Sequence, residues 1–193
     1  MGDKKRIAIF LATGFETTEA LTTTDILRRA SGVQVDLISV HPHKTVFSAH
    51  GVVVIADEII STIWNKDKGK SYDLLVLPGG DIGTSNLISC EELKNMVVSF
   101  LDDPTKKVAA ICAAPQIIGL LKKADNREIA VYPNRLNWLE NSVTYHDRPL
   151  VISDNLITSP SMGSVFKFAL SLVELMVGKK ERIRIEDDLV ILF

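Results

Sequence analysis

Residues 107–121 read Lys-Val-Ala-Ala-Ile-Cys-Ala-Ala-Pro-Gln-Ile-Ile-Gly-Leu-Leu, the pattern of a buried strand followed at once by a helix. We expect the strand over residues 108–111 and the helix from near Ala114 and Pro115, because proline suits the first turn of a helix. Cys112 then lies at the strand end, where open α/β sheets bind ligands and free helix N–H groups stabilise a thiolate. This stretch alone leaves two readings of Cys112 open, a nucleophile or a small buried core residue.

Strands and helices alternate on both sides of this stretch. Nearly continuous apolar runs, typical of strands buried on both faces of a parallel sheet, occupy residues 5–11, 33–40 and 72–77. Shorter strands are expected at residues 45–55 (a hairpin), 129–131, 150–153 and 156–159. Helices are expected from Thr17 or Thr18 to about Arg29, at residues 91–101 and at residues 163–176. The alternation predicts an α/β fold with a mostly parallel sheet, in a single domain over residues 1–193.

The remaining segments carry weaker patterns. Residues 57–64 form a weak helical segment, residues 65–71 a charged loop, and residues 134–148 a polar, irregular stretch. The tail at 179–193 is charged and then apolar. We expect its apolar end to pack on the body or on a partner subunit, because an exposed run of this kind favours aggregation.

The composition excludes several classes of function. The 193 residues carry a net charge of -2, which does not favour binding to nucleic acid or to an anionic membrane. No secretory leader or membrane-spanning run is recognised. The two cysteines, Cys90 and Cys112, suggest no disulfide framework, so a reducing, cytoplasmic location is expected. His41 and His43 flank a proline in a turn, and no metal site is predicted.

Three loops with unusual chemistry follow strands that we expect to be neighbours. They contain Glu16 and Glu19, then Pro78-Gly79-Gly80, then Cys112. Because such loops converge at one edge of the sheet, the glycine amides and that of Ala113 can form an oxyanion hole beside Cys112. The alternative for the glycines is a simple tight turn.

Glu19 has two interpretations. Near a helix start it can be a surface acid favoured by the helix dipole. If it instead points to Cys112, it is buried, and burial raises the pKa of a carboxyl group. A protonated Glu19 then donates a hydrogen bond to the thiolate, and the two groups titrate as a coupled pair.

Three stretches of the chain resemble one known family in combination. They are Gly-Phe-Glu-Thr-Thr-Glu at 14–19, Tyr-Asp-Leu-Leu-Val-Leu-Pro-Gly-Gly at 72–80 and Ala-Ala-Ile-Cys-Ala-Ala-Pro at 109–115. Residues 156–159 and 163–170 add to the likeness, which covers nearly the whole chain. The sequence resembles the ThiJ/PfpI superfamily and, within it, the branch of the parkinsonism-associated protein deglycase.

The resemblance implies a flavodoxin-like three-layer sandwich and a homodimer, with no cofactor. It implies that Cys112 is the nucleophile and Glu19 its acidic partner. The backbone donors are then Gly79, Gly80 and Ala113. Glu16 matches a further acidic position near the pocket.

The sequence departs from the family pattern at two places. Tyr132 stands where many relatives have a histidine, and tyrosine is a poor general base at neutral pH. His50 stands where the close branch tends to have arginine. Residues 159–161 also lack an arginine seen in relatives, so recognition of anions beside the thiolate is expected to differ. Tyr132 and His50 are therefore candidate pocket residues of this chain.

Three functions are considered for this site. The leading hypothesis is a cysteine-dependent, cofactor-independent glyoxalase or deglycase, a lyase or hydrolase acting on methylglyoxal, related α-oxoaldehydes or their protein adducts. The alternative is a redox-sensing stress-response protein or chaperone whose Cys112 oxidises to sulfinic acid without turnover. A cysteine peptidase or amidase is weakened by Tyr132 and requires another base, for which His146 is the candidate.

Overall fold

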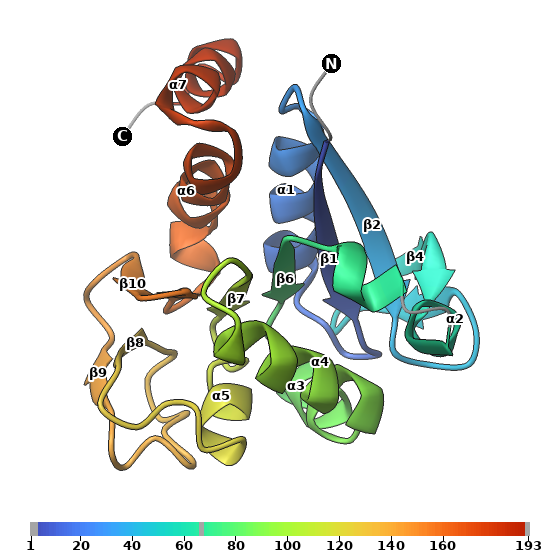
Figure 1. The fold of residues 1–193 in the computed structure, drawn as a ribbon, viewed down its shortest axis with the longest axis vertical. Coiled ribbons are helices and arrows are strands. Elements are labelled where there is room, and N and C mark those ends of the chain that lie inside the picture. The colour runs from blue at the N-terminus through green and yellow to red at the C-terminus, as the bar shows by residue number, and fades with distance from the viewer. Residues whose placement is uncertain (1–3, 66–67, 192–193) are drawn as a thin grey trace.

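Alternate residues of strand β1 (Lys5–Leu11) face two different hydrophobic cores. The computed structural model, which describes residues 4–65 and 68–191, places Ile7, Ile9 and Leu11 in one core and Ala8 and Phe10 in the other. Each core is closed by helices on its own face of the sheet (Figure 1). A strand with both faces covered needs apolar residues at nearly every position, which explains the unbroken apolar run at the N-terminus.

The described residues form a sheet of seven strands in the order β10-β11-β7-β6-β1-β2-β5. The strands after β1 are β2 (Val33–Ser39), β5 (Glu58–Ile59), β6 (Leu74–Leu77), β7 (Lys107–Ile111), β10 (Val151–Ser153) and β11 (Leu156–Ser159). All pairs are parallel except β10 with β11. The carboxyl ends of β1, β6 and β7 therefore lie side by side. Because the chain runs from β1 outward in one direction and then returns to the other side of β1, this is the switch point where such sheets bind ligands.

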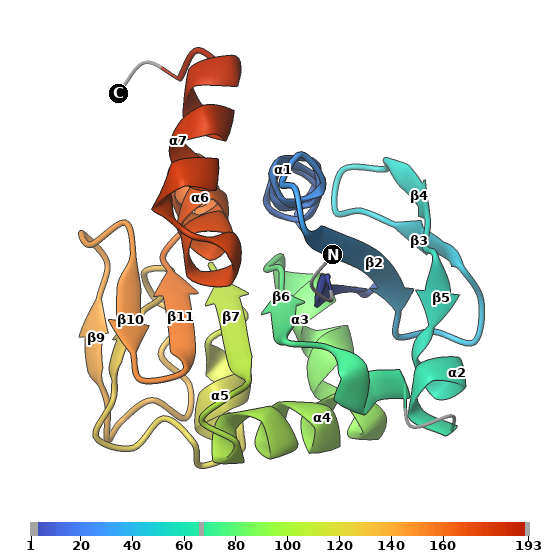
Figure 2. The same cartoon turned by 45° about the horizontal axis from the view of Figure 1, so that its top comes forward.

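Helices cover both faces of this sheet (Figure 2). One face carries α1 (Thr17–Arg28) and α6 (Val165–Val177), and α7 (Lys179–Asp188) packs on α6. The other face carries α2 (Ile60–Asn65), α3 (Asp81–Ile88), α4 (Glu91–Asp102) and α5 (Gln116–Leu120). The predicted α/β, flavodoxin-like three-layer sandwich with a mostly parallel sheet is confirmed.

Two small sheets and two short 3-10 helices complete the described fold. The small sheets pair β3 (Thr45–Phe47) with β4 (Val53–Ile55) and β8 (Glu128–Ala130) with β9 (Val143–Tyr145). The 3-10 helices are η1 (Lys68–Ser71) and η2 (Met162–Ser164). The expected hairpin at 45–55 is confirmed. Within the described ranges, no helix has the length and apolar character needed to cross a membrane.

Several elements differ from the sequence-based expectations. The α5 helix begins at Gln116, so a turn separates it from Cys112. Glu16 caps α1 instead of Thr17 or Thr18, because its side chain accepts the N–H of Thr18. Helix α3, strand β9 and helix α7 lie where no such element is predicted.

The sequence pattern does not predict helix α7, because only its tertiary contacts show which of its residues is buried. Its surface is mostly charged, and ion pairs one turn apart join Arg182 to Glu186 and Arg184 to Asp188. Its single fully buried side chain, Ile185, inserts into the core under α1 and α6. The expected packing of the apolar tail is supported for Leu189 and Ile191, which contact the same core, but not for Val190, which is largely exposed. Residues 192–193 lie outside the described residues.

Gly119 of α5 positions the segment that later supplies two pocket residues. A Cβ atom at this position would overlap the carbonyl oxygen of Trp138, so the backbone at Trp138, in the same segment as Tyr132 and Arg135, packs directly on the helix. Gly119→Ala is expected to lower the free energy of unfolding by about 2 to 3 kcal/mol, because neither backbone can withdraw without disturbing the core. Urea denaturation measures this change.

Gly163→Ala is the matched control for this substitution. A Cβ at Gly163 meets no described atom closer than the Ser161 Oγ, at 3.5 Å, which is ordinary contact. We expect a change below about 1 kcal/mol for this variant. Equal denaturation midpoints for the two variants would contradict close packing of the segment on α5.

Candidate active site around Cys112

Cys112 sits on a sharp bend directly after β7. Its φ of 63° lies in the left-handed region, which residues other than glycine rarely adopt. Its backbone N–H donates to Ser159 O at 2.9 Å, and its carbonyl accepts the N–H of Tyr132 at 2.9 Å. The conformation is therefore held from two sides, by the end of β11 and by the segment after β8. Strained backbone of this kind concentrates at functional sites, and here it presents the half-buried thiol at the sheet edge.

Glu19 lies in the first turn of α1 and is 1% exposed. The Gly79 N–H donates to its Oε2 at 2.9 Å, and the carboxyl group also interacts with the Cys112 thiol and the Met162 amide. Glu19 Oε1 is buried and has no partner at hydrogen-bond geometry among the described residues. The predicted approach of Glu19 to Cys112 is thus what the structure shows, and the surface-acid interpretation is wrong.

Gly79 makes this approach possible. A Cβ atom at this position would lie 2.6 Å from the Cys112 Cβ and 2.7 Å from Glu19 Oε2. Its amide, predicted to be an oxyanion donor, is instead used by the Glu19 carboxyl. The N–H groups of Gly80 and Ala113 interact with the Cys112 sulfur and lower its pKa, and their role as oxyanion donors stays a prediction.

Burial is the largest influence on the Glu19 carboxyl and raises its pKa to about 7. The hydrogen bonds from Gly79 and Cys112 oppose this rise, while the negative charge of Glu16 adds to it. Near neutral pH the carboxyl group is therefore about half protonated. It can both accept and release a proton there.

Burial also raises the pKa of the Cys112 thiol to about 12, with the negative charge of Glu19 as the next cause. The amides of Gly80 and Ala113 oppose the rise but do not outweigh it. The expectation that free N–H groups stabilise the thiolate holds for the Ala113 amide, but burial and the Glu19 charge outweigh it, so the net shift of the thiol pKa is upward. When Glu19 holds the proton its repulsion of the thiolate disappears, so the pKa of the Cys112 thiol is then less strongly raised, although burial still raises it.

A cavity of about 410 Å³ opens over these groups. Loops from the ends of β1, β6 and β7, the hairpin tip, the segment between β8 and β9 and the segment before α6 contribute to it. Its lining residues are Gly14, Glu16, Glu19, Ala49, Gly80, Asp81, Ile82, Cys112, Tyr132, Arg135, Ser161 and Met162. The predicted convergence of the three loops is therefore present.

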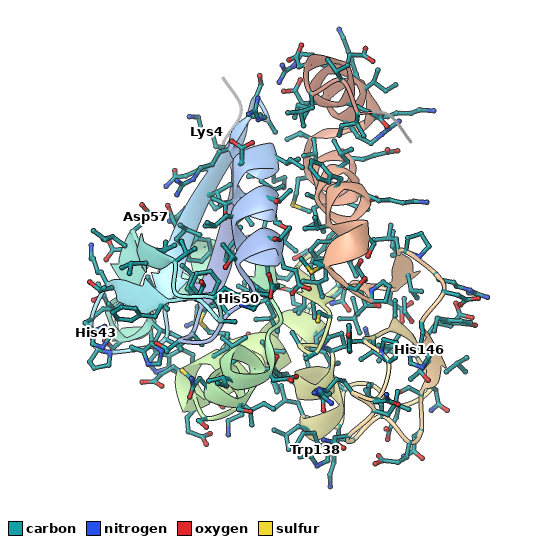
Figure 3. All side chains as sticks on the ribbon, turned by 180° about the vertical axis from the view of Figure 1, so that it is seen from behind. Lys4, His43, His50, Asp57, Trp138 and His146 are labelled. Atoms are coloured by element: carbon teal, nitrogen blue, oxygen red, sulfur yellow. The ribbon has the colours of Figure 1, made fainter. Side chains whose placement is uncertain are left out.

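Of the other predicted site residues, some line the cavity and others lie outside it. Glu16 and Tyr132 line the cavity. His50 does not, although its Nε2 lies 3.9 Å from Glu16 Oε2 at the rim, and its side chain is 79% exposed. His146 lies on the β8–β9 side of the molecule, away from His50 (Figure 3), with Nδ1 2.8 Å from Val131 O. His146 is not among the lining residues, so it does not replace the missing histidine base.

The sequence reasoning missed an ion pair in the cavity wall. Arg135 Nε and Nη2 donate to the two carboxylate oxygens of Asp81, each at 2.7 Å. Asp81 directly follows the glycine turn, but Arg135 comes from the polar stretch that carries no periodic pattern. No spacing rule joins two residues this far apart in sequence, so only the fold brings them together.

Metal ligands are not gathered at this cavity. In the part of the chain that the structure describes, no group of three His, Cys, Asp or Glu side chains is placed to hold a metal ion. The groups that interact with the Cys112 thiol are a carboxyl group that titrates near neutral pH and the backbone amides of Gly80 and Ala113. The other polar side chains of the described lining are those of Glu16, Asp81, Tyr132, Arg135 and Ser161.

The raised pKa of Glu19 makes stability depend on pH. The pKa is 4.5 for an ordinary glutamate and about 7 in the folded protein, so the folded state binds more protons between these values. Stability therefore falls as the pH rises through this window. Glu19→Gln removes this loss and is expected to gain roughly 2 to 3 kcal/mol relative to wild type between about pH 4.5 and pH 7.5. Urea unfolding at a series of pH values measures the difference, and parallel curves for the two proteins would contradict a buried, raised carboxyl.

The chain matches the DJ-1/PfpI family over residues 5–175. The protein DJ-1 homolog B of Arabidopsis thaliana is 31% identical over 187 residues, 96% of this chain but 41% of that longer protein. The glutathione-independent glyoxalase DJR-1.2 of Caenorhabditis elegans is 32% identical over 170 residues, 86% of this chain and 85% of that protein. The crystal structure of Drosophila melanogaster DJ-1beta has a TM-score of 0.91 at 27% identity and covers 98% of this chain and 100% of its own. With sequence and fold matching over most of its length, this chain belongs to the DJ-1/PfpI family.

Proposed function

We propose that this protein is a cofactor-independent glyoxalase that converts methylglyoxal and related α-oxoaldehydes to 2-hydroxy acids. The observation that carries the proposal is the buried Glu19 carboxyl, with a pKa of about 7, in contact with the Cys112 thiol. A general acid–base works best when its pKa lies near the working pH. The similarity to a relative named a glutathione-independent glyoxalase supports the same conclusion.

The first step joins Cys112 to the aldehyde carbon. The Glu19 carboxylate accepts the thiol proton as the sulfur attacks, which forms the carbon–sulfur bond and an alkoxide on the former aldehyde oxygen. The Gly80 and Ala113 amides, which point to the sulfur, are placed to donate to this oxygen. Glu19 then returns its proton to the alkoxide, and a neutral hemithioacetal results.

The second step moves a proton between two carbons. Glu19 removes the proton from the carbon bonded to sulfur and delivers it to the neighbouring carbonyl carbon through an enediol. The first carbon is oxidised to a thioester and the second is reduced to an alcohol, so no external oxidant is needed. Glu19 Oε1, buried and without a partner at hydrogen-bond geometry among the described residues, is the oxygen available for this transfer. Water then cleaves the thioester, releasing the hydroxy acid and the thiol.

Protein adducts of the same aldehydes are the second substrate class that we propose. In such an adduct the aldehyde carbon is a hemiaminal, so the Cys112 sulfur forms its bond to that carbon as the carbon–nitrogen bond breaks. Glu19 passes the thiol proton to the leaving amine, and the same hemithioacetal results. The peptidase or amidase hypothesis is not carried further, because His146 is outside the described cavity lining and Tyr132 is a poor base.

Cys112→Ala is expected to abolish methylglyoxal consumption, since the covalent intermediate cannot form. Glu19→Gln is expected to lower kcat by about a hundredfold to ten-thousandfold, because the amide cannot carry the proton. In the wild type, kcat/KM is expected to rise with pH through an apparent pKa of about 7, as Glu19 becomes a carboxylate. Methylglyoxal consumption with detection of lactate measures all three.

Cys90→Ala is the matched control, because Cys90 lies at the start of α4 and is not among the described lining residues of the cavity. This variant is expected to keep the wild-type rate. Turnover that survives in Cys112→Ala would overturn the glyoxalase proposal.

A redox sensor is the second candidate function, and the same site favours it. Oxidation of the Cys112 thiol by two equivalents of peroxide gives a sulfinic acid and two waters. The Gly80 and Ala113 amides and a protonated Glu19 are placed to donate to the new oxygens. Such hydrogen bonds stabilise the sulfinic acid form of Cys112, whereas an oxidised cysteine that lacks these donors is not stabilised in this way.

Mild peroxide is expected to add two oxygen atoms to Cys112 while Cys90 stays reduced, because Cys112 opens onto the cavity beside a Glu19 carboxyl that can donate when protonated, whereas Cys90 is not among the described lining residues. Mass spectrometry of the two cysteine peptides measures the selectivity, and thermal unfolding of the oxidised protein shows whether its stability changes. Equal oxidation of both cysteines, or unchanged unfolding after selective oxidation, would remove the support for a sensor.

The predicted homodimer and cytoplasmic location stay predictions. The exposed apolar side chains of the β3–β4 hairpin, Phe47, Val53 and Ile55, form the surface that we propose for the subunit contact. The molecular mass in solution checks this.

A further inference from the structure

The charges around the cavity are mostly negative. Its described lining includes three carboxyl groups, from Glu16, Glu19 and Asp81, and one cationic side chain, that of Arg135. His50 lies at the rim beside Glu16, is largely exposed and does not line the cavity. Whether the cavity accepts an anionic ligand therefore depends on how far Arg135 is neutralised.

Asp81 neutralises Arg135 through a bidentate contact. Both carboxylate oxygens lie 2.7 Å from guanidinium nitrogens, and Arg135 Nη1 donates to Asn134 O at 3.2 Å. These bonds use three of the five guanidinium N–H groups. The planar, paired geometry fixes the guanidinium in the cavity wall and directs its charge to Asp81 instead of the cavity.

The Asp81–Arg135 pair lies between two cavities. On one side is the cavity over Cys112, and on the other is a cavity of about 250 Å³ that Asp81, Arg135, Thr84, Ala113 and Gln116 help to line. Arg135 interacts electrostatically with Cys112 and Tyr132 as well as with Asp81. A ligand bonded to the Cys112 sulfur is thus within the influence of this guanidinium.

We propose that the Asp81–Arg135 pair makes the cavity select neutral electrophiles and reject those that carry a carboxylate or phosphate. With Asp81 in place, the described lining has no net positive charge to offer an anion, and Glu16 repels it. The inference rests on the proposed function for its substrate class: uncharged 2-oxoaldehydes are substrates, and their carboxylated analogues are not. Asp81 and Arg135 are specificity-determining residues in this assignment.

Two pairs of probes, each with a neutral and an anionic member of the same carbon chain length, test the proposal. Iodoacetamide and iodoacetate alkylate Cys112 as a neutral and an anionic reagent, and 2-oxopentanal and 4,5-dioxopentanoate are a neutral and an anionic oxoaldehyde. The ratio of rates within each pair cancels any change in the reactivity of the thiol itself. We expect wild type to favour the neutral member of both pairs by about tenfold or more.

Asp81→Asn leaves Arg135 unpaired and is expected to shift both ratios toward the anion by about tenfold, chiefly through KM for the oxoaldehyde. Adding Arg135→Gln to Asp81→Asn is expected to cancel this shift. Asp102→Asn is the matched control, since Asp102 pairs with Lys123 on the surface and the substitution changes the net charge equally. Its ratios are expected to equal those of wild type.

The outcomes separate the two proposals. Alkylation ratios that do not respond to Asp81→Asn, or respond equally to Asp102→Asn, would overturn charge selection by the pair. If alkylation is selective as expected but neither oxoaldehyde is consumed above the Cys112→Ala background, the glyoxalase proposal fails while charge selection at Cys112 stands.

Discussion

The burial of the Glu19 carboxyl against the Cys112 thiol is the contact on which the rest of the site depends. Two ionisable groups cannot both be charged in such a place, so they share a proton, and burial raises the pKa of each. The Gly79 amide holds one carboxylate oxygen. The left-handed backbone at Cys112 brings the sulfur to the carboxyl, and the end of β11 and the segment after β8 hold that backbone in place.

The shared proton connects the two functions that we propose. A carboxyl group that exchanges its proton near neutral pH can move a proton between the two carbons of an oxoaldehyde. The same group, when protonated, can donate to the oxygens of an oxidised Cys112. Turnover and oxidation therefore compete for one thiol, and Gly80 and Ala113 serve both because their amides point to the sulfur.

The wall of the cavity is where this chain differs from the family pattern that its motifs resemble. Tyr132 occupies a position at which many relatives carry histidine, and His50 stands at the rim instead of lining the cavity. The one cationic side chain in the described lining comes instead from Arg135, which is held by Asp81. The two residues come from different loops, so the selectivity that we propose can change without altering Cys112 or Glu19.

The sequence by itself determined the α/β alternation, the mostly parallel sheet and the meeting of three loops at Cys112, because unbroken apolar runs and glycine turns are local signals. The three-layer sandwich came from the resemblance to a family. That resemblance also indicated Glu19 as the acidic partner. Only the tertiary structure decided that the Gly79 amide serves Glu19, that burial raises the thiol pKa, and that Asp81 meets Arg135. Burial, pKa and long-range pairing depend on which segments pack together, and this is a property of the folded chain that no stretch of sequence carries alone.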